Sequence, residues 1–203
     1  MVYCTKDDVK AYGKISYSDL GFANDAAFDT FLDVLISLAQ GIINSYCSVP
    51  SGFFDASGIS FTNQLYDYRH PWIDLWYYPV LSVSKVEYND QGYGTTANWI
   101  TVTEPDYIIN KGTGQLMLVE DTPATVDQSV RVSYTAGYSS VPDVIKQVAI
   151  QLSSNILHEI LQRKLSPLVR ADDLTIKVLI PETLSRHLQS MLTPYARRAV
   201  AVG

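Results

Sequence analysis

Hydrophobic residues in the first quarter of the chain repeat with a helical period. A capped start at Thr5 predicts a short helix over about residues 6–13. A longer helix is predicted after Asn24, because the apolar residues that follow recur at three- and four-residue steps and share one wide face. That stripe consists of Phe28, Phe31, Leu32, Leu35, Ile36, Ala39, Ile42, Ile43 and Tyr46. The turn residues 50–52 end this helix.

The last third of the chain returns to the helical pattern. Pro142 suits the first turn of a helix, and the apolar positions after it predict a helix to about Lys164. Its stripe consists of Ile145, Val148, Ala149, Leu152, Ile156 and Ile160. A short helix is predicted after Pro181, with Leu184, Leu188, Leu192 and Tyr195 on one side. Residues 165–180 are expected to form a loop or an extended segment.

Between residues 53 and 137 the pattern changes to short runs of β-branched and aromatic residues separated by turn residues. Five strands are predicted, at Val80–Tyr88, Trp99–Val102, Tyr107–Ile109, Gln115–Val119 and Val130–Tyr134. These short runs predict a small antiparallel meander.

Together the elements predict an α+β chain whose core is a bundle of two long helices with short terminal helices beside them. The long helices are expected to pack on each other, because neither buries its stripe alone. We expect one domain in four parts. Residues 1–52 hold the N-terminal helices of the bundle, 53–137 a β-rich insertion, 138–164 a long core helix, and 165–203 a C-terminal extension with a short helix.

Composition and charge restrict the function. With 47% hydrophobic and 18% charged residues, the chain of 203 residues is expected to be globular. Residues 1–137 carry 7 basic and 16 acidic residues, net −9, and residues 138–203 carry 8 and 5, net +3, which together give −6. The acidic balance argues against a protein that grips DNA by its phosphates. The positive C-terminal part fits either an acidic partner surface or a solvated face.

Other compositional features fit a cytosolic, non-secreted protein with protein partners. Tyr occurs 14 times against 6 Phe, and Tyr is favoured at interfaces. Cys4 and Cys47 form no disulfide framework and no metal-binding spacing, and we expect both to be reduced and packed. The start of the chain shows no secretory signal, and the apolar runs are broken well before the length of a spanning helix.

No motif predicts catalysis, a metal or a cofactor. His158 and Glu159 lack the second histidine that would present two imidazoles on one helical face for zinc. His70 is a candidate acid–base partner of Asp67 or Asp74, but the aromatic cluster around it is better explained as a packed strand edge or contact surface. The glycine-rich turns join strand to strand and lack the helix that a phosphate site needs.

Several segments, in their order and spacing, resemble the head–tail connector (adaptor) proteins of tailed phages, a family of head-completion or neck proteins. The strand segments are 78–90, 107–110, 114–116 and 130–138, the last leading through Val141 and Pro142 into a long helix. Ile42–Cys47, where the earlier long helix ends in an aromatic residue, fits the same pattern. The resemblance covers about residues 5–163.

The resemblance implies a structural protein of the virion neck, made in the host cytoplasm, with no enzymatic activity. It implies a ring, dodecameric in the particle, that sits beneath the portal protein, extends the DNA channel and docks the stopper or a tail-completion protein. DNA would pass without specific binding, repelled by a ring of roughly −72 in total if it has twelve copies. No membrane partner is implied.

Two sets of residues are candidate contacts. The portal-binding set is Arg186, Tyr195, Arg197 and Arg198, and the set at the interface with a subunit or neighbour is Tyr66, Tyr68, Trp72, Trp76, Tyr77 and Tyr93. A competing interpretation of the C-terminal part is that residues 181–196 pack back on the bundle. Competing functions are another neck protein (stopper or tail terminator), a DNA-packaging accessory factor and, more distantly, an enzyme.

Overall fold

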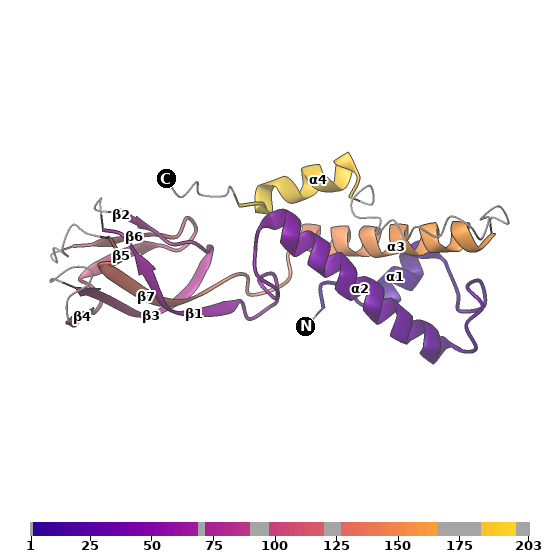
Figure 1. Ribbon diagram of the computed structural model, residues 1–203, viewed down its shortest axis with the longest axis horizontal. Coiled ribbons are helices and arrows are strands. Elements are labelled where there is room, and N and C mark those ends of the chain that lie inside the picture. The colour runs from indigo at the N-terminus through magenta and orange to yellow at the C-terminus, as the bar shows by residue number, and fades with distance from the viewer. Residues whose placement is uncertain (1, 69–71, 90–97, 120–126, 166–183, 198–203) are drawn as a thin grey trace, which may run out of the picture. The chain divides into compact units, whose positions relative to one another are not determined.

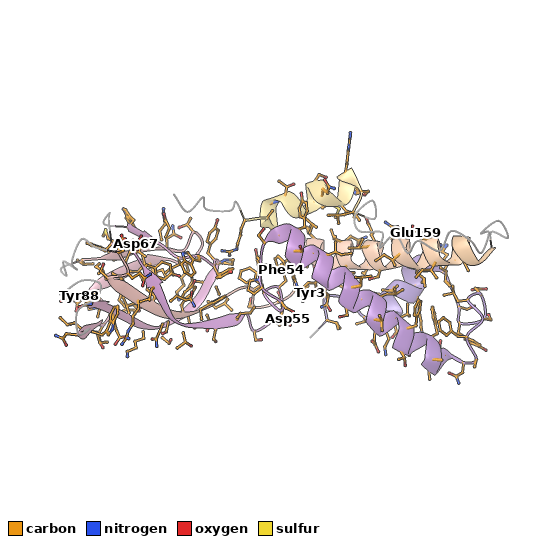
Figure 2. The ribbon with its side chains drawn as sticks, in the orientation of Figure 1. Tyr3, Phe54, Asp55, Asp67, Tyr88 and Glu159 are labelled. Atoms are coloured by element: carbon orange, nitrogen blue, oxygen red, sulfur yellow. The ribbon has the colours of Figure 1, made fainter. Side chains whose placement is uncertain are left out.

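The chain divides into two compact units (Figure 1). The computed structural model describes residues 2–68, 72–89, 98–119, 127–165 and 184–197. In the third helix its side chains are described up to residue 161 (Figure 2). Residues 1–51 and 141–203 make up the helical unit, and residues 52–140 make up the β unit.

The helical unit contains helices at the four predicted positions. They are α1 (Lys6–Gly13), α2 (Asp25–Cys47), α3 (Asp143–Leu165) and α4 (Arg186–Leu192), and a short 3₁₀ turn, η1 (Thr193–Tyr195), follows α4. Thr5 and Asp8 form a capping box at the start of α1, and the Asn24 side chain accepts from the N–H of Ala27 at the start of α2. The predicted loop over 165–180 lies, from residue 166, outside the described residues.

Each of these helices packs against at least one other. Helix α3 contacts α1, α2 and α4, and α2 also contacts α1 and α4. The buried side chains come from every helix and include Val9, Phe28, Leu32, Ile36, Ile43, Ile145, Val148, Leu152, Leu188 and Leu192. Lys10 of α1 pairs with Asp25 (2.9 Å) and Asp29, and Lys6 pairs with Asp33 (3.2 Å), so charges one turn apart on α2 hold α1 against it.

The β unit contains seven strands among the described residues. They are β1 (Ile59–Tyr66), β2 (Trp72–Asp74), β3 (Val80–Asn89), β4 (Trp99–Val102), β5 (Tyr107–Asn110), β6 (Gln115–Leu118) and β7 (Val130–Ala136). The five predicted strands are confirmed, but β1 and β2 were not predicted. Strand β1 lacks a clean alternation, because three polar residues follow one another and the register shifts around Asn63, whose φ is +52°.

The predicted meander is wrong, since strands adjacent in the sheets are not consecutive in the chain. One antiparallel sheet has the order β1-β7-β3-β4 and the other has the order β2-β6-β5. The last strand, β7, lies between β1 and β3, and five of its seven residues are buried. Its residues therefore form the centre of the β unit's core.

The predicted architecture, a bundle of two long helices with a small β insertion, is also wrong. The protein has a β-rich α+β fold with four helices and two antiparallel sheets among the described residues. The long helices α2 and α3 do not form a bundle by themselves, since α1 and α4 supply part of the core that covers them. The β segment buries its own apolar side chains between its own strands, as a compact unit does.

Candidate interaction surfaces

An apolar row crosses the outer face of the three-stranded sheet. Trp72 pairs with Met117 on the neighbouring strand, and Met117 pairs with Ile108 on the next, so the three side chains stand on the same face. Trp72 is 41% exposed and Ile108 is 52% exposed. The next row, Asp74, Gln115 and Asn110, is polar. This face, with an apolar row beside a polar one, is a candidate protein-contact surface.

Two of the predicted interface tyrosines lie inside the β unit or partly inside it. Tyr66 is buried and its hydroxyl is 3.0 Å from that of Tyr134, and burial raises the pKa of the Tyr66 phenol well above its usual range. Tyr77 is half-buried and its ring stacks on Phe61 at a centroid distance of 4.5 Å. Both side chains hold the β unit together, and the ring of Tyr66 does not reach the surface.

The other predicted interface residues are exposed, half-buried or outside the described part of the chain. Trp76 is 54% exposed and its ring lies 5.3 Å from that of Tyr66. Tyr68 is half-buried just after the end of β1. Tyr93 lies outside the described residues. Among the described members of this set, Trp72 and Trp76 are the exposed ones.

The C-terminal candidates surround a helix that packs on its own chain. The stripe Leu184, Leu188 and Leu192 is buried, and the hydroxyl of Tyr46 on α2 donates to the Gln189 carbonyl at 3.3 Å. Arg186 is exposed at the start of α4, whereas Tyr195 and Arg197 are half-buried. Arg198 lies outside the described residues. The stripe is therefore not a free surface, and Arg186 is the most accessible of the described members of the set.

A cluster of charged side chains around Glu87 lies within the β unit. Glu87 is buried, accepts two hydrogen bonds from the Arg131 guanidinium and lies 2.8 Å from the Lys85 ammonium. Arg131, followed by Lys85, lowers the pKa of the Glu87 carboxyl, and the Arg131 guanidinium lies over the ring of Trp99 at 4.3 Å. This cluster joins β3, β7 and β4.

Neither cysteine is placed for chemistry. Cys4 and Cys47 are free and buried, as predicted, and burial raises the pKa of Cys4 to about 11 and that of Cys47 to about 12. Both thiols are protonated at neutral pH. No cluster of three or more metal-ligating side chains occurs in the described part of the chain. His70, the candidate acid–base residue, lies outside that part.

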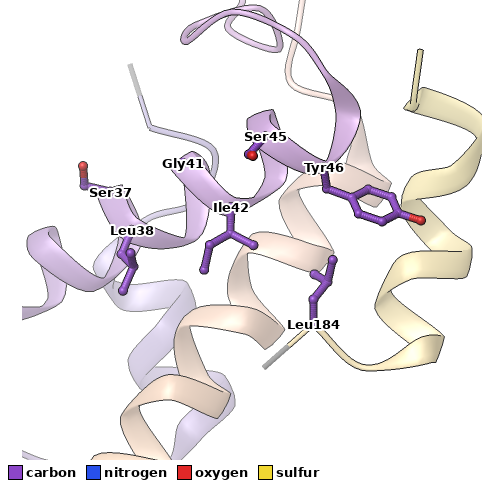
Figure 3. A pocket seen from close by; sticks show the side chains of 7 residues that line it. All are labelled: Ser37, Leu38, Gly41, Ile42, Ser45, Tyr46 and Leu184. Carbon is purple, nitrogen blue, oxygen red and sulfur yellow. The ribbon is translucent and has the colours of Figure 1, made fainter. Parts of the chain in front are cut away.

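The sequence interpretation missed an apolar groove on the helical unit. It is lined by Ser37, Leu38, Gly41, Ile42, Ser45, Tyr46 and Leu184, and its volume is about 520 Å³ (Figure 3). A signal was present in the sequence, because no charged residue occurs between Asp33 and Asp55. A surface helix ordinarily carries charges on its outer side.

The comparisons with known proteins bear on the fold. No family model matches the chain, and no curated protein matches it. Among solved structures, the chain is similar to one in the neck of an empty GTA (phage-like gene transfer agent) particle computed with C6 symmetry. The identity is 14%, the match covers 97% of this chain and 91% of that chain, and the TM-score is 0.52.

A second likeness is to a chain in the neck of a native GTA particle computed with C12 symmetry. Its identity is 14%, its coverage is 88% of this chain and 86% of that chain, and its TM-score is 0.42, too low to support an argument. The first likeness shows a shared fold over nearly the full length of both chains.

Proposed function

We propose that this chain is a structural protein of the neck of a phage-like particle, without enzymatic activity. More specifically, we propose an adaptor that assembles as a ring beneath the portal, twelve copies in the particle, extends the DNA channel and docks the stopper or a tail-completion protein. The observation that carries the proposal is the fold shared with a chain of a particle neck across 97% of this chain.

The surfaces of both units support a role in assembly. The β unit exposes Trp72, Trp76 and Ile108, and the helical unit carries the groove on α2. Large exposed apolar side chains on a protein with few charged residues are typical of protein–protein contacts. An assembly protein requires such faces on more than one side, because each copy has lateral neighbours as well as partners along the axis.

The distribution of charge supports a channel role rather than DNA binding. The β unit, residues 52–140, has 4 basic and 10 acidic residues, net −6, whereas the helical unit has 11 of each, net zero. A protein that grips DNA needs a basic face to neutralise phosphates. A ring of acidic β units would instead repel DNA and keep it mobile.

Electron cryo-microscopy of intact particles that contain this chain tests the proposal. We expect density for a ring of this fold between portal and tail. Deletion of the gene is expected to leave filled heads that lose DNA and carry no tails. Location of the chain in the capsid shell or tail fibre, or normal tailed particles after deletion, would overturn the proposal.

We further propose that the portal is bound through the C-terminal basic residues Arg186, Arg197 and Arg198, with Tyr195 beside them. Because Leu188 and Leu192 are fully buried, truncating this segment would damage the core, and charge reversal is the cleaner test. Arg186→Glu is expected to weaken binding to purified portal protein about tenfold or more without lowering the melting temperature. Lys111→Glu, an exposed turn residue of the β unit, is the matched control. Equal portal binding by Arg186→Glu and Lys111→Glu would remove Arg186 from the portal contact.

The alternative is another neck protein, a stopper or tail terminator, which the same shared fold and exposed surfaces also fit. The two are distinguished by the neighbour that each one binds in the particle. An adaptor binds purified portal directly, whereas a stopper or terminator binds only after the adaptor is in place.

A DNA-packaging accessory factor is a third candidate, and it would bind duplex DNA with strong salt dependence, which the acidic β unit disfavours.

A further inference from the structure

Helix α2 has two apolar faces, and the described residues of the chain bury only one of them. The inner face includes Phe28, Leu32, Leu35, Ile36, Ala39 and Ile43, all buried. The opposite face includes Val34, which is 61% exposed, and Leu38, which is 47% exposed. A helix that is apolar on both sides is ordinarily covered on both sides.

The outer face of α2 is continuous with the groove. Val34, Ser37, Leu38, Gly41, Ile42 and Ser45 fall within about 140° of arc at about 100° per residue, so they form one strip along the helix. Figure 3 shows Leu184 beside this strip, at the end that Tyr46 borders. Among the described residues that line the groove, the polar side chains are all hydroxyls, and that of Tyr46 donates to the Gln189 carbonyl.

Two kinds of surface fit an uncharged apolar strip of this length, a lipid bilayer and another protein. Among the described helices, α2 alone is long and apolar enough to cross a membrane, with a mean hydropathy of 1.5 over 18 residues, of which 33% are buried. However, α2 is tied to its own unit by the ion pairs of Asp25, Asp29 and Asp33 with α1 and by a fully buried inner face. Because these contacts keep α2 packed in its own unit, we interpret its outer face as a protein-binding surface and not as part of a membrane-spanning helix.

The distribution of charge over the two units favours a second copy of the chain as the partner of the strip. All of the net charge of the chain, −6, resides in the β unit, so two β units repel each other. The helical unit is neutral, and the strip on α2 has no charged side chain between Asp33 and the end of the helix. A second copy that presents its neutral helical unit therefore meets this strip without charge repulsion and with a gain from apolar burial.

We propose that the outer face of α2, centred on Leu38 and Gly41, binds a second copy of this chain. The inference rests on the proposed ring in one respect, namely that the contact is head-to-tail. In such a contact the strip of one copy meets a different surface of the next copy, since a contact between two identical patches closes at two subunits. Gly41 has no neighbouring atom within 4 Å of the position of a Cβ, so the strip leaves room for close approach.

Sedimentation velocity of the purified full chain over a range of concentrations tests the contact. Leu38→Asp places a charge in the strip, and Ala26→Asp adds the same charge at an exposed position in the first turn of the same helix. We expect the parent and Ala26→Asp to associate alike, and Leu38→Asp to associate at least about tenfold more weakly. Leu38→Lys is expected to behave like Leu38→Asp, because the contact is apolar. Circular dichroism and a thermal melt establish that each variant is folded.

Three outcomes would overturn the inference. The first is a parent chain that stays monomeric at every concentration. The second is association that Leu38→Asp leaves unchanged, or that Leu38→Lys preserves. The third is a parent that floats with phosphatidylcholine–phosphatidylglycerol vesicles while Leu38→Asp does not, which would assign the strip to a membrane.

Assembly on the portal separates this inference from the proposed function. If the parent and Leu38→Asp assemble equally on purified portal, the contact on α2 is wrong and the adaptor proposal stands. If the parent associates through the strip but never binds portal, the adaptor proposal fails and the contact on α2 stands.

Discussion

The phenolic oxygens of Tyr66 and Tyr134 lie 3.0 Å apart inside the β unit, and each also accepts a backbone N–H. The N–H of Trp76 donates to Tyr66 at 3.3 Å, and that of Tyr77 donates to Tyr134 at 3.2 Å. One phenol donates to the other, so two buried hydroxyls hold the segment after β2 against strands β1 and β7.

Removal of one of these hydroxyls should destabilise the β unit. In Tyr134→Phe the Tyr77 N–H loses its acceptor and Tyr66 loses its partner, so we expect the free energy of unfolding to fall by about 1–3 kcal/mol. Urea denaturation followed by tryptophan fluorescence measures the loss. Tyr107→Phe, which removes a more exposed hydroxyl bonded to Glu104, is the control and should change stability by less than about 0.5 kcal/mol. Equal stability of the two variants would contradict the structural role of the pair.

The Glu87–Arg131 pair predicts loss of stability in acid. The folded-state pKa of Glu87 is lowered, chiefly by Arg131, so its contribution is full above the unfolded pKa of about 4.3 and disappears as the pH falls through the folded value. Glu87→Gln should unfold about 1–3 kcal/mol more easily at neutral pH. Urea midpoints of parent and variant should converge below about pH 4. Midpoints that stay equally far apart at all pH values would show that the charge of Glu87 does not stabilise the fold.

Gly137 sits where no side chain fits. Its φ is +130°, and a Cβ there would lie 2.6 Å from the Phe53 carbonyl oxygen and 2.8 Å from the Cα of Gly58. Gly137→Ala should therefore lower stability by about 3 kcal/mol or prevent folding of the β unit. Gly112→Ala, in a turn with space for a methyl group, is the control. A thermal melt of both variants checks this, and a Gly137→Ala protein as stable as the control would refute the close contact.

Removal of a buried serine hydroxyl from α3 should raise the stability of the protein, whereas the substitutions above lower it. Ser153 and Ser154 are fully buried, and their hydroxyls have no hydrogen-bond partner among the described residues. Because a buried hydroxyl without a partner costs free energy and Ala favours helix, Ser154→Ala should stabilise the protein by about 1 kcal/mol. The exposed Ser190→Ala on α4 should shift stability by less than about 0.5 kcal/mol. A lower melting temperature for Ser154→Ala would show that its hydroxyl is engaged.

Helices were predictable because their signals are local. The capping box at Thr5 and Asp8, the Asn24 cap and the position of Pro142 mark helix starts that the structure reproduces within a residue. Strand β1 was missed, since its bulge at Asn63 breaks the two-residue period on which strand prediction depends. The pairing of β7 with both β1 and β3 joins residues far apart in sequence, and no local pattern encodes it.

The candidate surfaces were predictable only in part. Trp72 and Trp76 were identified from composition, but whether an aromatic residue faces solvent depends on register, which placed Tyr66 inside and Trp72 outside. On α2 the helical period separated the two sides: it placed Leu35, which is 4% exposed, on the buried stripe and left out Leu38, which is 47% exposed. That the other side is apolar as well follows from the absence of charged residues between Asp33 and Asp55, a signal that the periodicity does not contain.

The pairing of Ile59 with Ala136 brings the start and the end of the β unit together. Before that pair forms, α2 and α3 are joined by a loop of almost half the chain, and afterwards by a short effective connection. Closing the β unit therefore lowers the entropic cost of docking the two long helices by about 1–2 kcal/mol, because it shortens the loop that joins them. This predicts an order of folding in which Ile59 pairs with Ala136 before the two long helices dock. A substitution that weakens this strand pairing should therefore slow formation of the helical unit as well.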